Sequence, residues 1–433
     1  MAIDIRLVLL AIGITAFPTL VRADEPAPFG DTLTGDWGGW RSRLFEDGFN
    51  FTFGYTTETA ANLQGGTNEG VRYTDQWTLG ATLDLDKLLG LNGARIQITL
   101  TDRNGRSLSN DEHLGSLQEV QEVFGRGQTW RITQFWYDQA YFDKALDWKI
   151  GRLTVGEDFA SFSCDFMNLA FCGSQPGNVV GSYWFNWPVS QWATRLKAAL
   201  PSFGYVQLGA YEVNPGYLSR SYAFNPGDPP GATGALIPAE IGWLPSFGAR
   251  QQSGSYKFGA WYNTSKTPDV VENTEGQPLV VDGGQPRGRD GAYGAYINFV
   301  QKLTTPSPGQ PDRGLSAFLN VTIADRQTAT LDNQIATGIK YVGLFDSRPR
   351  DDIALAFART HVNSRVRAAE ELENAAGLGP VPLQSAEYET ELYYTVHATD
   401  WLNLRPNIQY IHQPGGIRQT DDVILGLKTA LRF

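Results

Sequence analysis

The last thirteen residues of the chain alternate between apolar and polar side chains. One face of this segment carries Val423, Leu425, Leu427, Leu431 and Phe433, and the other carries Asp422, Lys428 and Arg432. A β-strand has a side-chain period of two, so one face meets apolar material and the other meets water. In a soluble domain a chain end is normally frayed and polar. The aromatic residue at the apolar end therefore predicts a strand that closes a barrel in a membrane.

The first 23 residues have the pattern of an export signal. Arg6 gives a weakly positive start, residues 7–20 are mostly apolar, and Ala23 closes a cleavage site. No later stretch reaches the roughly 18 uninterrupted apolar residues that a membrane helix needs. This excludes a helical membrane protein. A barrel stays open, because each of its strands carries only about ten alternating residues.

The composition favours a barrel as well. The chain of 433 residues has 47 glycines, 12 tryptophans, 18 tyrosines and 23 phenylalanines but only two methionines. Glycine and aromatic residues serve the turns and interfacial girdles of outer-membrane barrels. A large secreted all-β enzyme or lectin is the alternative. The formal charge of −11 argues against a nucleic-acid partner.

Sixteen segments of the chain alternate in the manner of strands. They are residues 49–56, 72–85, 95–103, 130–142, 148–153, 192–200, 205–213, 239–244, 255–263, 292–303, 315–326, 335–345, 353–362, 386–399, 401–412 and 421–433. An even number is what single-chain bacterial barrels require. We therefore predict an all-β fold, a transmembrane antiparallel β-barrel of about sixteen strands, formed by one domain over residues 24–433.

The connections between these segments differ in length. Short reversals such as 143–146 alternate with long loops, which in outer-membrane barrels face the periplasm and the outside respectively. The turn-rich segment 24–48, with a short helical piece, is expected on the periplasmic side. Residues 113–124 form the one helix-like run of the long connections. We expect this run to be a short helix in an external loop.

Residues 154–191 form the longest stretch without clean alternation in the first half of the chain. The stretch contains Asp158, Asp165, Trp184 and Trp187. Long loops in compact proteins are usually functional. Folded inward, this loop would act as a constriction loop that narrows a wide barrel, although it could equally lie on the outer rim.

Cys164 and Cys172 are the only two cysteines. In an exported chain an oxidising compartment favours a disulfide, which would close a small loop. Two free thiols are the alternative. The four histidines are scattered, so we predict no zinc or other metal site and no cofactor.

Glu387, Glu389 and Glu391 alternate with apolar residues and lie on one face of a predicted strand. Burying an ionised carboxylate without a partner costs several kcal/mol, so these three must face water or partners. Arg405, and beyond it Lys428 and Arg432, are the expected partners. The alternatives are an ion ladder that supports the wall and direct contact with a solute.

Basic residues recur on the predicted inner face of the early strands. They are Arg72, Arg95, Arg103, Arg131, Arg152, Arg195 and Lys197. A guanidinium presents several fixed donors to hydroxyl or carboxylate oxygens, and an aromatic ring can cover the apolar face of a sugar. Such a lining suits neutral polyhydroxylated solutes, with support of the wall as the alternative role. Trp184 and Trp187 are either stacking platforms or residues that pack the loop.

Catalytic motifs are missing from the sequence. We find no nucleophile elbow, no His-Glu-x-x-His and no phosphate-binding loop, so the chain is not expected to be an enzyme. Carboxylates are plentiful, and a barrel hydrolase with paired carboxylates stays as an alternative of another class. A plugged, non-conducting structural barrel is a third.

Both ends of the chain resemble one known family. The matching residues are 33–41 (LTGDWGGWR) with Leu44, Gly48 and 62–66 (NLQGG) near the start, and 387–394, Trp401, Pro406, His412, 414–416 and 425–427 near the end. Residues 149–153 resemble its middle. This set is similar to the carbohydrate-selective porins of Gram-negative outer membranes, the OprB type.

The resemblance implies a barrel in the bacterial outer membrane that passes monosaccharides, usually glucose, by facilitated diffusion. Small organic acids are the second candidate solutes, given the arginines. The resemblance also implies that the outer-membrane assembly machinery recognises the C-terminal aromatic, here Phe433. Outer-membrane lipid and lipopolysaccharide are the expected surroundings, and the sequence is compatible with either a monomer or a trimer.

Overall fold

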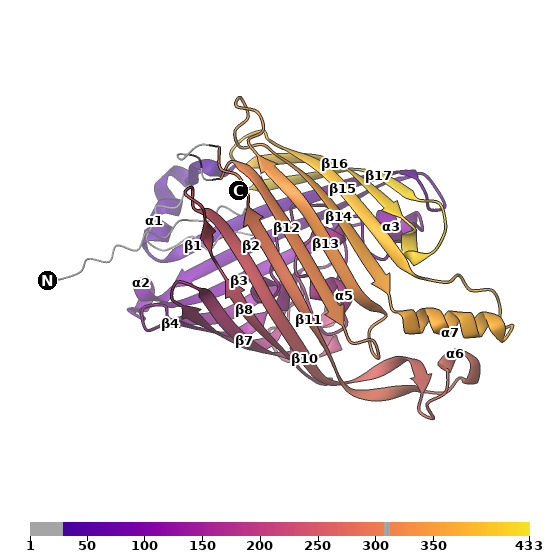
Figure 1. The fold of residues 1–433 in the computed structure, drawn as a ribbon. Coiled ribbons are helices and arrows are strands. Elements are labelled where there is room, and N and C mark those ends of the chain that lie inside the picture. Colours follow the sequence, from indigo (N-terminus) through magenta and orange to yellow (C-terminus); the bar gives the residue numbers. More distant parts are fainter. Residues whose placement is uncertain (1–28, 307–309, 311) are drawn as a thin grey trace.

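A computed structural model describes residues 29–306, 310 and 312–433 of the chain (Figure 1). The expected export signal lies outside the described residues. Within them, sixteen strands form the wall of a barrel. They are β1 (Phe49–Gln64), β2 (Val71–Asp84), β3 (Ala94–Gly105), β4 (Arg131–Tyr141), β5 (Leu146–Leu153), β6 (Gln191–Leu200), β7 (Gly204–Val213), β8 (Gly234–Trp243), β10 (Gln252–Asn273), β11 (Pro286–Lys302), β12 (Gly314–Ala324), β13 (Leu331–Val342), β14 (Asp352–Val362), β15 (Ala386–His397), β16 (Leu402–His412) and β17 (Asp422–Arg432).

Each strand pairs antiparallel with the next, and β1 closes the ring by pairing with both β2 and β17. The remaining strand, β9 (Ser246–Phe247), only extends the reversal before β10. The prediction of a barrel of sixteen strands is therefore confirmed. It succeeds because a wall between lipid and lumen imposes the period of two on every strand.

The two ends of the barrel carry different connections. Near the N-terminal segment lie η1 (Phe29–Asp31), η2 (Trp37–Gly39), α1 (Trp40–Glu46) and the turn helix α2 (Leu85–Leu89). The other connections with helices are long and lie at the opposite end or inside. They contain α3 (Leu108–Asp111), α4 (Val155–Asp158), η3 (Leu169–Phe171), α5 (Gln175–Val179), η4 (Pro215–Leu218), η5 (Arg220–Tyr222), α6 (Leu279–Asp282), α7 (Ser364–Ala375) and η6 (Pro414–Gly416).

Two local predictions are wrong. Residues 113–124 contain no helix; the short helix α3 precedes them and is capped by the Ser107 hydroxyl, which accepts from the Asn110 N–H. Residues 113–124 are irregular because a side chain of the barrel wall, Glu387, binds the backbone N–H groups of Leu117 and Gln118. The predicted strands 255–263 and 292–303 are too short, since β10 continues to Asn273 and β11 begins at Pro286, and the two extend together beyond the barrel (Figure 1). The amphipathic helix α7 has no counterpart among the predictions.

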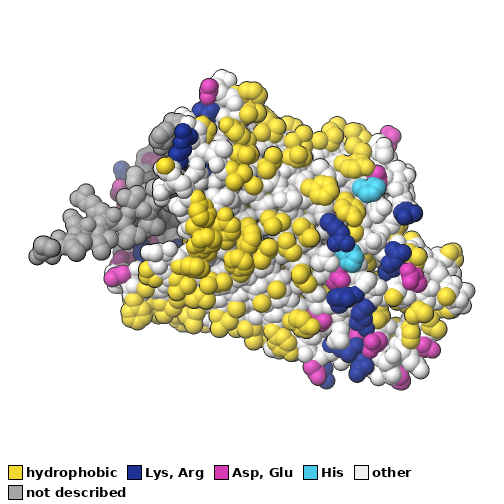
Figure 2. All heavy atoms as spheres, viewed as in Figure 1, with side chains coloured by type: hydrophobic (Ala, Val, Ile, Leu, Met, Phe, Trp, Pro, Cys, Tyr) yellow, Lys and Arg dark blue, Asp and Glu magenta, His cyan; other side chains and the backbone are white. Residues whose placement is uncertain are grey.

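Apolar side chains cover the outside of the wall (Figure 2). Leu196, Phe258, Phe357 and Leu425, from four separate strands, are each between 46% and 50% exposed. Their inward-facing neighbours in sequence are mostly buried, so each strand separates an apolar outer face from a polar inner one. No helix among the described residues is long and apolar enough to cross a membrane.

The N-terminal segment lies against the seam at which the barrel closes. The guanidinium of Arg41, on α1, donates to the backbone oxygens of Phe433 (3.0 Å) and Phe51 (2.9 Å) and lies 4.6 Å from the ring of Phe29. The Phe433 N–H donates to the Phe53 backbone oxygen at 3.0 Å. The two ends of the described chain are thus joined at one end of the barrel.

Candidate functional site

The loop between β5 and β6, residues 154–190, crosses the interior of the barrel. It leaves one side of the wall and contacts inward-facing residues of five strands on the other side. These residues are Lys257 of β10, Thr322 of β12, Lys340 of β13, Glu391 of β15 and Lys428 of β17. A loop on the outer rim could not reach these side chains. We call residues 154–190 the inner loop.

A disulfide joins Cys164 to Cys172 within the inner loop. The segment 164–172 is held to the wall through its backbone and through buried apolar side chains such as Phe166 and Met167. Glu391 accepts from the N–H groups of Met167 (2.9 Å) and Asn168 (2.7 Å), and the Lys428 ammonium donates to the backbone oxygen of Cys164 at 2.9 Å. Because charged groups form the stronger hydrogen bonds, these contacts fix the segment firmly.

The long connection between β3 and β4, residues 106–130, also enters the barrel. Glu387 accepts from the N–H groups of Leu117 (2.7 Å) and Gln118 (3.3 Å), and also from Gly415. Glu389 lies between Glu387 and Glu391 on the same face of β15 and accepts from the Thr360 hydroxyl at 2.7 Å. Glu387 and Glu391 thus bind backbone N–H groups of inner segments, and Glu389 binds a hydroxyl of the neighbouring wall strand β14.

The basic residues expected as partners of the glutamates form their ion pairs with other acids. Arg405 lies 3.6 Å from the Asp165 carboxylate and stacks on Tyr393, and Arg432 pairs with Asp31 at the other end of the barrel. Lys428 pairs with two further carboxylates. The three glutamates form no ion pair among the described residues, because backbone N–H groups supply the compensation that a buried carboxylate needs.

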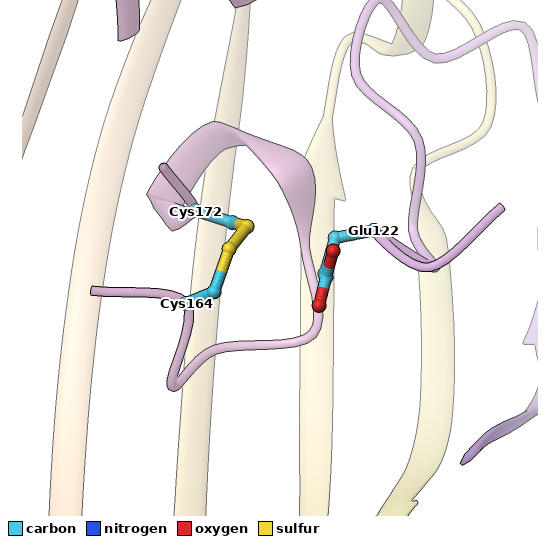
Figure 3. A group of neighbouring side chains, drawn as sticks. All are labelled: Glu122, Cys164 and Cys172. Atoms are coloured by element: carbon cyan, nitrogen blue, oxygen red, sulfur yellow. A yellow bond between two sulfur atoms is a disulfide. The ribbon is translucent and has the colours of Figure 1, made fainter. Parts of the chain in front are cut away.

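Glu122, Cys164 and Cys172 come close together (Figure 3). This group has the composition of a metal site. Its two sulfurs are joined in the disulfide, however, and Glu122 pairs with Lys428 at 2.7 Å. A disulfide supplies no thiolate ligand, so the group has no chemistry suited to zinc. Its position joins the inner loop to the 106–130 connection.

The carboxylate of Asp158, at the end of α4, is held by the wall beside it. Lys149 lies 2.7 Å away, Arg195 lies 3.6 Å away, and the Tyr211 hydroxyl donates at 3.2 Å. Burial alone would raise the pKa of Asp158, but the two cations outweigh it and hold the pKa below its usual value. Asp158 is therefore ionised at neutral pH and anchors α4.

Glu157, next to Asp158, has a different environment. It accepts from the Gln134 amide at 2.6 Å and the Thr154 hydroxyl at 2.5 Å and forms no ion pair among the described residues. Burial raises the pKa of Glu157 to about 7. The folded protein therefore holds the proton of the Glu157 carboxyl more tightly than the unfolded chain does. As the pH rises from the usual pKa of a glutamate to about 7, Glu157 lowers the free energy of unfolding.

This carboxyl should make the channel sensitive to pH. We expect the permeability of cations relative to anions in planar bilayers to fall as the pH is lowered from 8 to 6, because Glu157 loses its charge in that interval. Reversal potentials under a KCl gradient measure the effect. Glu157→Gln should reduce the change, whereas Glu371→Gln on α7 should leave it as it is. An unchanged pH dependence in Glu157→Gln would assign the effect to another group.

The arginines predicted to line the lumen mostly face inward and have partners. Arg72 pairs with Asp111 and Glu112, Arg95 with Asp138, Arg103 with Glu122, and Arg195 with Asp147. Arg152 differs, because it lies on the same face of β5 as the outward-facing Ile150. Its guanidinium donates to backbone oxygens of Ser190 and Asn225 and covers the Tyr217 ring.

The two tryptophans of the inner loop have different surroundings. Trp184 is completely buried, lies 5.3 Å from the Trp261 ring, and donates to the Ser174 hydroxyl at 3.1 Å. It packs the loop against the wall. Trp187 is half-buried, and its indole N–H donates to Gln76 of β2 at 3.1 Å. Of the two residues, only Trp187 is partly exposed.

Sequence reasoning missed one further anchor of the inner loop. Glu240, 2% exposed on β8, accepts from the Ala160 N–H at 2.8 Å and from the hydroxyls of Tyr205 (2.7 Å) and Tyr296 (2.8 Å). The available signal was a single carboxylate alternating with apolar residues in an otherwise apolar strand. Such a residue must face a polar interior.

The fold and the inner loop together define an outer-membrane channel, and comparisons with known proteins agree. The family model described as carbohydrate-selective porin, OprB family, matches residues 68–433. Porin B of Pseudomonas aeruginosa is 46% identical over 98% of this chain and 96% of its own length. The structure of Pseudomonas putida OprB at high pH covers 93% of this chain and 98% of its own, with 45% identity and a TM-score of 0.89.

A more distant structure shares the fold alone. The outer-membrane channel DcaP of Acinetobacter baumannii is 10% identical, with a TM-score of 0.51, and covers 90% of this chain and 98% of its own. The protein belongs to the carbohydrate-selective porins of the OprB family. It is an outer-membrane β-barrel that serves the passage of sugars, and its family and fold are those of a channel.

Proposed function

We propose that the solute is a monosaccharide such as glucose and that the inner loop forms the constriction it must pass. The observation that carries this proposal is the reach of the loop across the barrel to β10, β12, β13, β15 and β17. A segment anchored on both sides of the lumen narrows it. The end with α1 and the short reversals faces the periplasm, so sugar enters from the end with the long connections.

Passage is downhill and uses hydrogen bonds along the constriction. Arg95, whose side chain is 35% exposed, and the half-buried Gln134, Glu157 and Lys197 present donors and acceptors to the interior. A sugar hydroxyl exchanges its bonds to water for bonds to these groups. Weak binding at several positions favours throughput, because a tightly held solute leaves slowly. No catalytic step is part of this proposal.

Sugar-dependent block of the current tests the proposal directly. In planar bilayers, glucose added to one side should lower the conductance in a saturable way, and liposome swelling should be faster with monosaccharides than with larger sugars. Conductance indifferent to glucose would contradict the sugar specificity, and a strong anion preference would support small organic acids. Turnover of a glycoside by the purified protein would favour the hydrolase alternative.

Trp187 is proposed as a surface against which the sugar ring stacks. An aromatic contact contributes about 0.5–1.5 kcal/mol beyond burial, so Trp187→Ala should weaken glucose block by roughly two- to tenfold. Titration of the bilayer current with glucose measures the change. Trp148→Ala, on the outward face of β5, is the control. Equal block in Trp187→Ala and the unmodified protein would place the sugar elsewhere.

A further inference from the structure

Basic side chains gather on the outside of the barrel where the apolar belt ends. Figure 2 shows dark blue and cyan groups beside the yellow belt, toward the end with α7. On that side Ile323, Ile335 and Phe357 are between 40% and 59% exposed and belong to the belt. Arg359 and His361 follow Phe357 on the same face of β14, and Arg326 follows Ile323 at the end of β12. These groups lie at the level of the lipid headgroups.

Two of these three basic groups, Arg326 and His361, share one buried acid. Asp332, whose side chain is 7% exposed, lies 2.6 Å from His361 Nδ1 and 3.5 Å from the Arg326 guanidinium. Arg359 donates to the Asn333 amide oxygen at 2.9 Å and forms no ion pair among the described residues. Arg326 is 58% exposed. The surface therefore presents positive charge outward, in a chain whose net charge is −11.

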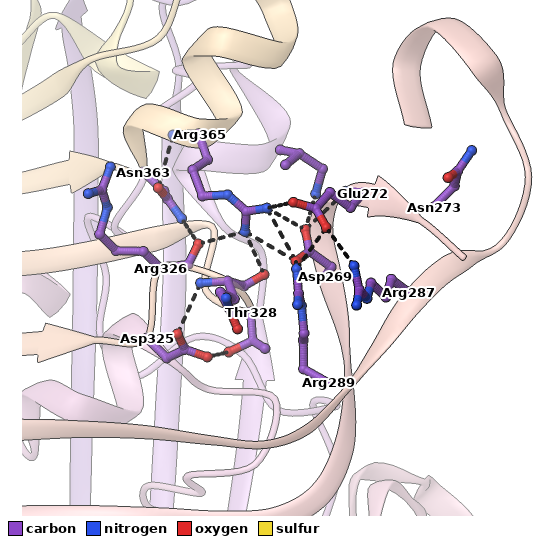
Figure 4. A network of polar contacts seen from close by, with 12 residues as sticks. Asp269, Glu272, Asn273, Arg287, Arg289, Asp325, Arg326, Thr328, Asn363 and Arg365 are labelled. Carbon is purple, nitrogen blue, oxygen red and sulfur yellow. Dashed lines mark hydrogen bonds and ion pairs between the residues drawn. The ribbon is translucent and has the colours of Figure 1, made fainter. Parts of the chain in front are cut away.

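A second network holds this surface in place. Arg365 of α7 binds the Asp269 carboxylate (3.0 Å) and Glu272 (3.1 Å), and its guanidinium also donates to the backbone oxygen of Arg326 at 3.3 Å (Figure 4). Asn363 donates to the same oxygen at 2.6 Å. The backbone of Arg326 is thus fixed by α7, and α7 is fixed by the β10–β11 extension. Less side-chain and loop entropy is lost when a ligand binds such a rigid surface.

We propose that Arg326 and Arg359 bind a phosphate group of lipopolysaccharide, the phosphorylated glycolipid of the outer leaflet. Guanidinium groups match phosphate oxygens with paired hydrogen bonds, and a basic surface beside a lipid-facing belt recognises anionic headgroups. The lipid chains continue onto Ile323, Ile335 and Phe357, and the phosphate reaches the two arginines. His361 lies beside them, against the same Asp332 that Arg326 contacts.

The test compares Arg326→Gln/Arg359→Gln with Arg432→Gln, a matched control. Arg432 is also 58% exposed and pairs with one acid, but it lies at the other end of the barrel. Each protein is refolded without lipopolysaccharide and titrated with it, and bound lipid is counted by native mass spectrometry. A charge-assisted hydrogen bond contributes about 1.5–3 kcal/mol, so the double variant should bind at least tenfold more weakly. The control should bind normally.

Two further binding experiments distinguish the phosphate of lipopolysaccharide from free phosphate as the ligand. Dephosphorylated lipopolysaccharide should bind the unmodified protein as weakly as the double variant binds the intact lipid. Inorganic phosphate should not compete at millimolar concentration, since it lacks the chains. Equal binding by the double variant, equal binding of dephosphorylated lipid, or full competition by phosphate would each overturn the proposal. Glucose block should be unchanged in all variants, which shows that each barrel is folded.

Discussion

Replacing Lys428 by Met is expected to lower the free energy of unfolding by about 3–5 kcal/mol, the usual effect of removing one partner of a buried ion pair. Lys428 is 5% exposed, and its ammonium lies 3.1 Å from Glu58 and 2.7 Å from Glu122. It also donates to the backbone oxygens of Cys164 and Phe166. Without it, two carboxylates and two carbonyl groups lose their partner in the interior.

Urea unfolding in detergent micelles, followed by tryptophan fluorescence, measures this loss. Arg432→Met, on the same face of β17, is the control, because exposed pairs contribute at most about 1 kcal/mol. Adding Glu58→Gln to Lys428→Met removes one orphaned charge and should recover part of the stability. Similar losses for Lys428→Met and Arg432→Met would mean that water reaches Lys428 and that it does not hold the inner loop.

Deleting Phe433 is expected to reduce the folded protein in the outer membrane several-fold while export across the inner membrane continues. The deletion removes the N–H bond to Phe53, the acceptor for Arg41, and a ring that lies 5.7 Å from the Trp77 ring. The seam of the barrel is thereby weakened at the end where α1 joins it. The family resemblance also predicts that the assembly machinery recognises a C-terminal aromatic, here Phe433.

Fractionation with an antibody against the chain measures the outcome, and two controls separate the causes. Phe433→Tyr keeps both backbone bonds and an aromatic ring and should assemble normally. Leu427→Ala shortens an exposed apolar side chain of the same strand and should have little effect. If the deletion refolds normally in detergent but fails in cells, recognition is impaired. Normal outer-membrane levels of the deletion variant would exclude a role of Phe433 in closing the seam and in recognition by the assembly machinery.

The wall of the barrel could be predicted from the sequence because each strand carries its own signal. Tyr73 and Trp77 face outward while Thr74 and Gln76 face inward, and the same period recurs in all sixteen strands. The helix expected at 113–124 failed for a related reason. Its pattern suited a helix, but Glu387 binds the N–H groups of Leu117 and Gln118 and holds an irregular backbone. Tertiary contacts overrode local preference.

The interior was predicted only in part. It was correct that Glu387, Glu389 and Glu391 require compensation, since that follows from the cost of burying charge. Their partners could not be predicted, because the backbone N–H groups of Leu117 and Met167 are present in every residue and leave no mark on the sequence. Glu391 and Met167 are 224 positions apart. Pairing over that distance depends on how the loops fold inward.

The docking of segment 164–172 has a consequence for how this channel could diversify. Glu391 binds its N–H groups, and Lys428 and Arg405 bind its carbonyl oxygens, while Phe166, Met167 and Phe171 are buried in apolar clusters against the wall. Substitutions of these buried side chains therefore loosen the loop before they alter the surface that a solute meets. Selectivity can evolve more freely at partly exposed positions of the inner loop outside this segment, such as Glu157 and Trp187.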